Sequence, residues 1–360
     1  MSINQTNQFD FGIQYTRNQI QYSYKQNDTT SVLDRDDTGS TFTDYIQDQL
    51  KFYNSKVIIK PGLRVTYFDV TRKSYLEPRV SAYYQLSDHI KLKGAAGRYY
   101  QFVKQINRED ITQGNRNFWI LSNAGSLPVT KSDHLILGGS YENKDYLLDV
   151  EFYQKNNSGI TEYTLRFVPQ LRQGLTADET FFTGTEVIKG VDILLQRKFG
   201  SLTGWVGYTL AEAQRNIAQY SDKPYYSDQD VRHQVKFVGM YQYKKWDLAA
   251  TWIFSTGRPY TSIIGGYQLT LLDGTTRDFT NLSDKNANRF NDYHRMDVSA
   301  TYHINPQFSV GLSVFNLHNR INTWYKRFEV TKEDDVSILQ TTNVNYLGIT
   351  PNLTLSWKLR

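Results

Sequence analysis

The chain has 360 residues, with 41 lysines and arginines against 36 aspartates and glutamates, and it is rich in Tyr (27) and Phe (19). The charges are interspersed and form no basic run, which argues against nucleic-acid binding, while the lack of cysteine excludes disulfide scaffolds, cysteine-based zinc sites and thiol nucleophiles. No stretch approaches the roughly eighteen consecutive apolar residues that a membrane-spanning helix needs. This aromatic-rich composition, with only 8 prolines, favours strands over helices.

The first sixteen residues, MSINQTNQFDFGIQYT, have neither the basic region nor the apolar region of a secretory signal peptide. We therefore expect either that the sequence is a fragment or truncated reading frame whose first half is missing, or that the chain is not a membrane β-barrel. The pattern of the remaining chain favours the fragment.

Apolar and polar residues alternate over many segments of about ten residues, as they must in a strand that faces lipid on one side and water on the other. Near the carboxyl terminus, Leu353, Leu355 and Trp357 alternate with Thr354 and Ser356. The same alternation recurs at residues 90–93, 148–152 and 308–314. These segments predict membrane-crossing strands around a wet interior.

The predicted connections alternate between short turns and longer polar loops, which is the asymmetry of an outer-membrane barrel with short periplasmic turns and long extracellular loops. This pattern predicts fifteen strands, of which the first descends at about 9–16 and the last lies at about 337–358. Because an up-and-down barrel normally has an even number of strands, the odd number implies that strands are missing upstream. The short turns are predicted near 16–18, 54–56, 87–89, 143–145, 199–201, 244–246 and 304–307, and the loops at about 28–41, 69–74, 103–128, 159–181, 215–228, 257–290 and 331–336.

Several blocks, in their order along the chain, resemble successive hairpins of TonB-dependent outer-membrane receptors, in a Tyr- and Asn-rich form similar to Bacteroidota receptors. The blocks are LPVTKSDHLILGGSYENKDYLLDVEFYQKNNSGI at 127–160, the hairpins at 184–213 and 228–261, YHRMDVSATYHI at 293–304 and FSVGLSVFNLHNRIN at 308–322. The resemblance covers about residues 40–360. It implies an all-β, antiparallel, up-and-down transmembrane barrel, with about 15 of a usual 22 strands in a single domain over 1–360 and with the first strands and the plug missing. The chain departs from the pattern where Leu359 and Arg360 replace a terminal aromatic residue.

The resemblance implies a receptor in the bacterial outer membrane, with extracellular loops, that imports a scarce nutrient such as an iron chelate, an oligosaccharide or a peptide. Its implied partners are outer-membrane lipid, the extracellular nutrient, the TonB complex through the missing plug, and, if its gene lies alongside, a surface lipoprotein. A passive porin or surface adhesin barrel, or a non-functional gene fragment, are the alternatives. Neither nucleic acid nor a cofactor is expected.

The sequence offers no catalytic constellation. The six histidines are scattered without metal-ligand spacing, and the Asp-rich segment at Asp34 has Tyr45 where a calcium loop needs a glutamate. No G-x-S-x-G spacing occurs. We therefore expect no enzyme, no catalytic residue and no metal site.

Guanidinium and aromatic groups near the predicted outer rim are the candidate ligand contacts, because they suit an anionic chelate or a sugar by charge-assisted hydrogen bonds and stacking. The alternative for the same residues is an ordinary aromatic girdle with rim arginines, and for Arg232 pairing with acidic residues of neighbouring strands. The candidates are Arg98, Tyr100, Arg108, Arg116, Trp119 and Arg232.

Overall fold

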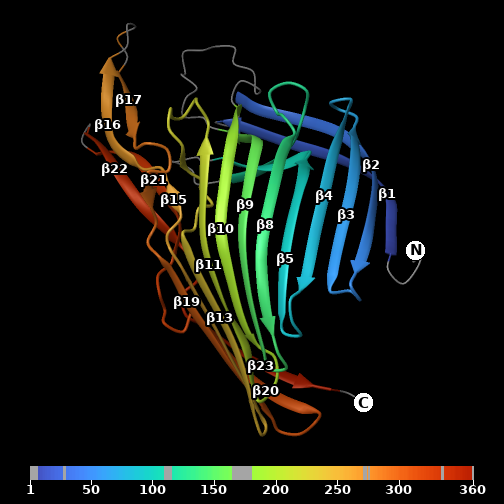
Figure 1. The fold of residues 1–360 in the computed structure, drawn as a ribbon. Helices are drawn as coiled ribbons and strands as arrows, with labels where there is room; N and C mark the ends of the chain where they lie inside the picture. The colour runs from blue at the N-terminus through green and yellow to red at the C-terminus, as the bar shows by residue number, and fades with distance from the viewer. Residues whose placement is uncertain are drawn as a thin grey trace.

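The structure is a computed structural model that describes residues 7–26, 30–108, 116–163, 181–270, 274, 276–333 and 336–358. All regular elements among these residues are β-strands, and neighbouring wall strands are antiparallel (Figure 1). Within the same ranges, no helix is long and apolar enough to cross a membrane.

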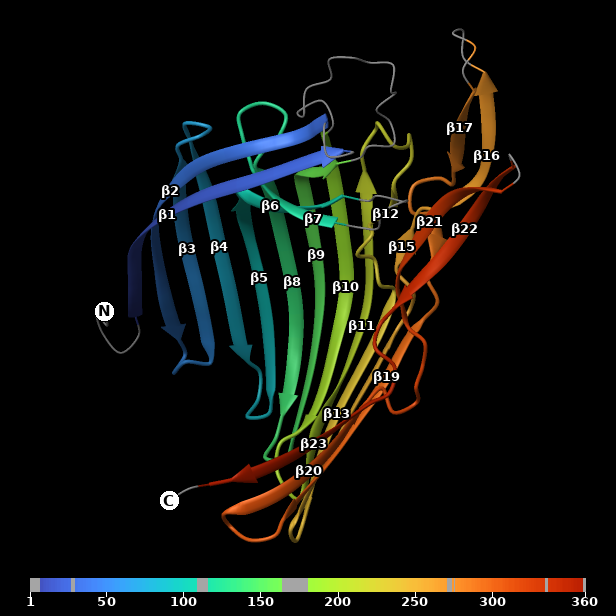
Figure 2. The ribbon, with the colours of Figure 1, turned by 180° about the vertical axis from the view of Figure 1, so that it is seen from behind.

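Fourteen strands of a 17-stranded sheet follow one another in chain order and form a continuous wall. Short turns join them at one rim, and the longer excursions leave from the other rim (Figures 1 and 2). The wall strands are β1 (Asn7–Gln26), β2 (Thr30–Phe52), β3 (Val57–Phe68), β4 (Lys73–Gln85), β5 (Ile90–Gln101), β8 (Thr130–Glu142), β9 (Tyr146–Tyr163), β10 (Phe181–Arg197), β11 (Leu202–Asn216), β13 (His233–Tyr243), β14 (Trp246–Ser255), β19 (Tyr293–His303), β20 (Phe308–Phe315) and β23 (Thr350–Trp357).

The excursions carry short strands of their own. These are the hairpin of β6 (Val103–Arg108) and β7 (Arg116–Leu121), the two-residue β12 (Tyr225–Tyr226), the pair β15 (Pro259–Tyr260) and β18 (Asn288–Arg289), and the hairpins of β16 (Ile263–Thr270) with β17 (Thr276–Leu282) and β21 (Thr323–Glu333) with β22 (Val336–Asn345). The asymmetry between short turns and long excursions is therefore confirmed.

The wall is curved into an open trough (Figure 2). Among the described residues, β1 pairs along its length with β2 and β23 pairs with β20, and neither of these two end strands is hydrogen-bonded to a further strand on its outer edge. The antiparallel up-and-down fold predicted from the alternation is confirmed, and in this chain the sheet is not closed.

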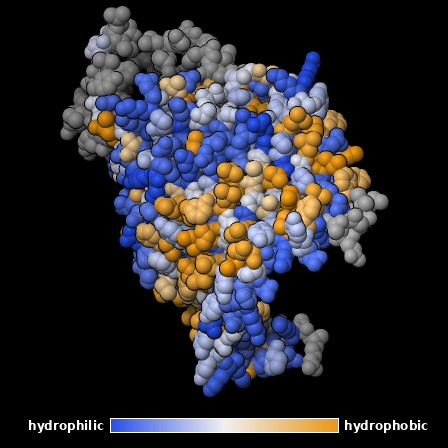
Figure 3. Space-filling model, in the orientation of Figure 1, coloured by the Kyte–Doolittle hydropathy of each residue, from blue (hydrophilic) through white to orange (hydrophobic). Residues whose placement is uncertain are grey.

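The two faces of the wall differ as the alternation requires. The convex face carries exposed apolar side chains such as Leu137, Phe152 and Leu312, and these gather in a band across the middle of the molecule (Figure 3). On the concave face, the Lys93 ammonium lies 2.8 Å from the Asp149 carboxylate and also pairs with Glu151. A charged interior behind an apolar exterior is the arrangement of a barrel that encloses water within a membrane.

The predicted turn at 16–18 is wrong. Strand β1 runs unbroken through this segment, with Arg17 opposite Ser40, because the partner strand β2 continues alongside it as far as Thr30. The predicted loop at 28–41 is consequently strand from Thr30 onward. Losing this turn reduces the wall to fourteen strands and makes the first one ascending, which corrects the count of fifteen.

The connection predicted as a long loop at 69–74 is a four-residue turn over 69–72, in which Arg72 has a φ of 53°. The remaining predicted turns lie where the structure has short reversals. Much of the predicted loop at 159–181 lies outside the described residues.

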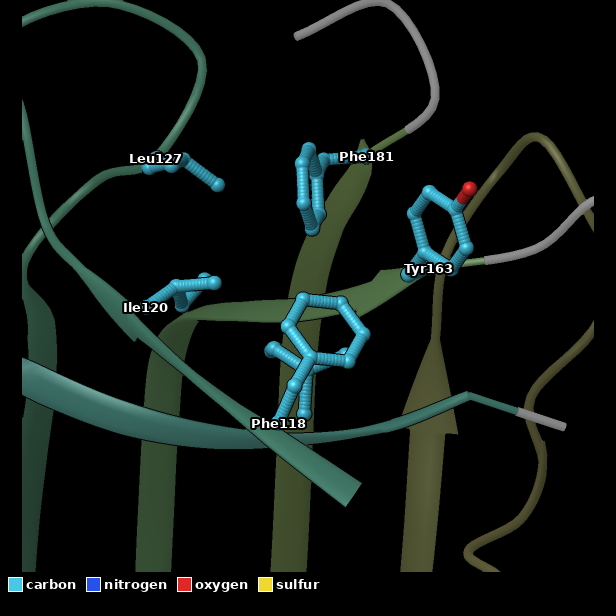
Figure 4. Close-up of a cluster of buried hydrophobic side chains, with 6 residues drawn as sticks. Phe118, Ile120, Leu127, Tyr163 and Phe181 are labelled. Atoms are coloured by element: carbon cyan, nitrogen blue, oxygen red, sulfur yellow. The ribbon is translucent and has the colours of Figure 1, made fainter. Parts of the chain in front are cut away.

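A buried apolar cluster fastens the β6–β7 hairpin against the concave side of the wall near the long-loop rim (Figures 2 and 4). The ring of Tyr22 on β1 stacks on Phe118 at 4.6 Å between centroids, so the upper part of β1 also packs on this cluster. The hairpin therefore occupies the interior and does not extend away from the rim. The cluster consists of Ile106, Phe118, Ile120, Leu127, Tyr163 and Phe181.

Candidate ligand-binding site on the concave face

Two adjoining cavities lie between the β6–β7 hairpin and the upper ends of β9, β10 and β11. Their volumes are about 460 Å³ and about 570 Å³, and both are lined by Gln105, Thr161 and Arg215. Volumes of this size fall within the range of small-molecule sites. Most of the lining side chains are polar or charged, so the cavities suit a hydrophilic ligand.

Arg215 is the centre of the charged groups in these cavities. Its Nε lies 2.8 Å from Oε1 of Glu186, and its Nη1 lies 2.7 Å from Oε1 of Glu162 and 3.0 Å from Oδ1 of Asp228. The Arg215 side chain is 19% exposed, and those of Glu162 and Glu186 are 11% and 10% exposed. One guanidinium thus binds carboxylates from β9, from β10 and from the loop after β12. These ion pairs attach that loop to the rim of the wall.

The strand register explains how these residues come together. Asn157 on β9 lies opposite Glu186 on β10, which in turn lies opposite Arg215 on β11, so that all three side chains project from the same face. The Asn157 amide donates to Oε2 of Glu186 at 2.9 Å. Cross-strand pairing therefore builds a polar row on the concave face.

The loops after β11 and β17 close one side of the smaller cavity. The buried Asp230 carboxylate accepts a hydrogen bond from the backbone N–H of Ala213 at 2.7 Å and pairs with Arg289. The Tyr225 hydroxyl donates to Oε1 of Glu162 at 3.2 Å, and burial raises the pKa of this hydroxyl. Lys285 lies 3.4 Å from the second oxygen of Glu162.

Lys104 is a buried cation on the face of the hairpin that packs against the wall. Its Nζ donates to the carbonyl oxygen of Gly159 at 2.7 Å, to Oγ1 of Thr161 at 3.0 Å and to the carbonyl of Pro128. Burial lowers the pKa of Lys104 to about 7. The lysine therefore ties the hairpin to the wall while holding a proton that is released near neutral pH.

One of the six candidate ligand residues lines a cavity, and a second lies beside a lining residue. Trp119 is 51% exposed on the β6–β7 hairpin, directly opposite Gln105, which lines both cavities. Tyr100 borders the larger cavity, and its ring contacts that of Tyr75 at 4.9 Å.

Two other candidates lie on the opposite face. Arg98 pairs with Asp133 at 2.7 Å, and Asp133 shares its face with the exposed Leu135. Arg232 pairs with Glu212 at 3.0 Å on that same convex face. The structure does not bring Arg98 or Arg232 to the cavities.

The last two candidates lie opposite each other: Arg108 is the last residue of β6, and Arg116 is the first residue of β7. Their side chains fall outside the described part of the structure.

The sequence reasoning missed Arg215, Glu162 and Glu186. Glu186 occupies an inward position of β10, so a charged residue at an inward position near a strand end was the available signal for it. Glu162 and Arg215 carried no comparable signal, because they lie in the segments predicted as loops at 159–181 and 215–228. Among the described residues, no group of three or more His, Asp or Glu side chains is arranged to hold a metal ion.

An antiparallel wall with an apolar convex face and a charged concave face defines a β-barrel protein of the outer-membrane type. Residues 2–317 match the family model described as TonB dependent receptor-like, beta-barrel, and the chain belongs to this family. Membership of this family places the chain in the bacterial outer membrane. No curated protein matches the sequence.

Solved structures with the same fold include siderophore receptors of Pseudomonas aeruginosa. The ferric enterobactin receptor PfeA aligns over 98% of this chain and 51% of its own, with 14% identity and a TM-score of 0.62. FpvA bound to a heterologous pyoverdine aligns over 99% of this chain and 46% of its own, with 11% identity and a TM-score of 0.64. The chain thus spans about half the length of these receptors.

Proposed function

We propose that this chain forms the pore wall and part of the ligand-binding rim of a TonB-dependent receptor that imports an iron chelate. The observation that carries the proposal is the pair of polar cavities between the β6–β7 hairpin and the wall. They lie on the concave face, at the rim that bears the long excursions, where an external ligand would enter. The similarity to receptors for ferric enterobactin and ferripyoverdine supports a chelate over other cargo.

The chemistry of the site also supports a chelate. Lys155 and Lys285 add cationic groups to the cavity walls, and Trp119 presents an exposed ring from the same hairpin as Gln105. A ferric catecholate combines negative charge with flat aromatic rings, which suits ammonium groups and a stacking surface. The proposed ligand contacts are therefore Trp119, Tyr100 and the two lysines.

The proposal includes parts of the receptor beyond this chain. We propose that further strands complete the barrel, that a plug domain fills it, and that the TonB complex acts through the plug. The rim with the long excursions is proposed to face the outside of the cell. The coverage of about half of each solved receptor supports this division.

The test is ligand binding by the chain refolded in detergent, measured by quenching of tryptophan fluorescence. We expect saturable quenching by a ferric catecholate, and weaker quenching by a ferric hydroxamate or a maltooligosaccharide. Trp119→Ala should weaken catecholate binding by about tenfold, the loss of one stacking contact. Trp357→Phe, at an exposed position on β23, is the matched control and should leave the affinity unchanged. Saturable binding of the oligosaccharide alone would assign a different cargo.

A further inference from the structure

The two cavities on the concave face differ in charge. In the smaller one, of about 460 Å³, the carboxylates of Glu162 and Asp228 face the cations of Arg215 and Lys285. These four groups pair with one another at distances of 2.7, 3.0 and 3.4 Å. In the larger cavity, three Lys or Arg side chains face a single carboxylate. The smaller cavity therefore favours a neutral polar group over a further ion.

Two carboxamides of the β6–β7 hairpin line the smaller cavity. Gln105 and Asn117 are exposed, and within the described ranges neither side chain makes a hydrogen bond to the protein. Both project from the face of the hairpin opposite to the buried cluster. Gln229 adds a third carboxamide from the loop after β12, where its Nε2 donates to Oδ2 of Asp228 at 3.4 Å.

The fourth carboxamide of this cavity, Asn286, has a structural role. Its side chain is buried, its Nδ2 donates to the carbonyl oxygen of Tyr226 at 2.8 Å, and its Oδ1 accepts from the Thr261 hydroxyl at 3.4 Å. The carboxamides that can turn toward a ligand are therefore Gln105, Asn117 and Gln229.

Carboxamides are complementary to peptide bonds, because each side-chain amide presents a carbonyl acceptor beside N–H donors in one plane. None of the described residues that line the smaller cavity carries an aromatic ring, so the cavity offers no surface on which a second catechol ring could stack. Its chemistry thus suits amide groups better than another iron-binding ring.

The hairpin connects this cavity to the proposed contacts of the chelate. Gln105 lies directly opposite Trp119 in the β6–β7 register, and it lines both cavities. Asn117 precedes Trp119 by two residues on β7, so the three side chains project from the same face of the hairpin. A chelate in contact with Trp119 can therefore extend a side arm past Gln105 into the smaller cavity.

We propose that the smaller cavity binds an uncharged peptide arm of the imported chelate through Gln105, Asn117 and Gln229. This inference rests on the proposed uptake of an iron chelate, and it narrows the cargo to chelates that carry amino-acid residues beside their iron-binding groups. The iron-binding core contacts Trp119 and Tyr100, and the peptide bonds of the arm exchange hydrogen bonds with the three carboxamides.

The test compares three ferric complexes of catechol amides that differ only in a neutral arm of matched length: glycylglycinamide, an alkyl chain, or a tris(hydroxymethyl)methyl group. Their binding to the full chain refolded in detergent is measured by quenching of tryptophan fluorescence. We expect the peptide arm to tighten binding about tenfold relative to the alkyl arm, the effect of two hydrogen bonds of ordinary net strength. The hydroxyl arm should bind like the alkyl arm.

Variants separate the arm from the core. Asn117→Leu and Gln229→Leu should each reduce the gain from the peptide arm about threefold, the loss of one hydrogen bond, without changing the affinity for the alkyl-arm complex. Trp119→Ala should weaken both complexes equally, because its ring contacts the shared core. Gln154→Leu is the matched control and should keep the full gain, since it removes a carboxamide from the convex face of β9, opposite the exposed Leu135.

Equal affinity for the peptide-arm and alkyl-arm complexes would overturn this inference and leave the proposed uptake function standing. An equal gain from the hydroxyl arm, or an undiminished gain in Asn117→Leu and Gln229→Leu, would do the same. Binding of none of the three complexes would overturn the proposed function and this inference together. The two leucine variants lie in different segments, so a folding defect in one of them leaves the other as the test.

Discussion

Replacing Arg215 by glutamine tests whether the charged cluster holds the rim of the wall together. The substitution leaves Glu186 and Glu162 with side chains that are only 10% and 11% exposed, and removes the guanidinium that neutralises both. Removing one partner of a buried ion pair costs about 3–5 kcal/mol. The Asn157 amide and Lys285 still reach these two carboxylates, so we expect the lower end of the range.

The assay is equilibrium unfolding of the refolded chain in detergent by guanidinium, followed by tryptophan fluorescence. The double variant Arg215→Gln/Glu186→Gln should recover about half of the lost stability, because it removes one of the uncompensated buried charges. As a control, Lys91→Gln breaks the exposed pair of Lys91 with Glu142 and should unfold at the wild-type denaturant concentration. An Arg215→Gln midpoint equal to that of Lys91→Gln would refute the reasoning.

Further predictions concern the hairpin and its loops. Phe118→Ala should destabilise the chain by about 3–5 kcal/mol because this ring is 2% exposed in the cluster, whereas Trp119→Ala, one residue away and 51% exposed, should change stability by less than about 0.5 kcal/mol in the same denaturation assay. Burial lowers the pKa of Lys104 to about 7 from 10.5, so the unfolded chain binds more protons between these values and stability should rise with pH across that interval. Lys104→Met should abolish this rise, and a persisting slope would contradict the assignment to Lys104. Gly257→Ala would place a Cβ 1.6 Å from the carbonyl oxygen of Phe290. Because the backbone must shift to relieve this clash, we expect faster hydrogen exchange in the loop between β14 and β19. Gly265→Ala is the control, because a Cβ there meets nothing within 4 Å.

The wall was predictable because one physical rule acts along every strand. Apolar and polar residues must alternate in a strand between lipid and water, so segments such as Leu353 to Trp357 can be recognised as strands from their own sequence. The turn predicted at 16–18 was wrong because the structure of that segment depends on its partner strand. A strand of 20 residues is longer than a membrane requires, and β1 continues through the predicted turn because β2 extends alongside it beyond the wall.

The candidate site was only partly predictable, because facing direction depends on register. Arg98 and Arg232 have the chemistry of ligand contacts, yet their partners Asp133 and Glu212 hold them on the convex face. Arg215 and Glu186 become neighbours only when β10 and β11 pair, although they are 29 residues apart in sequence.

The sequence by itself determined the antiparallel membrane wall, its apolar and polar faces, and the rim that carries the long excursions, because each follows from local alternation and turn chemistry. Only the tertiary structure decided that the β6–β7 hairpin folds into the interior and encloses polar cavities. That choice depends on contacts of Phe118 with Tyr22, Tyr163 and Phe181, which belong to segments far apart in the chain. Burying these apolar rings together is more favourable than leaving the hairpin exposed to water.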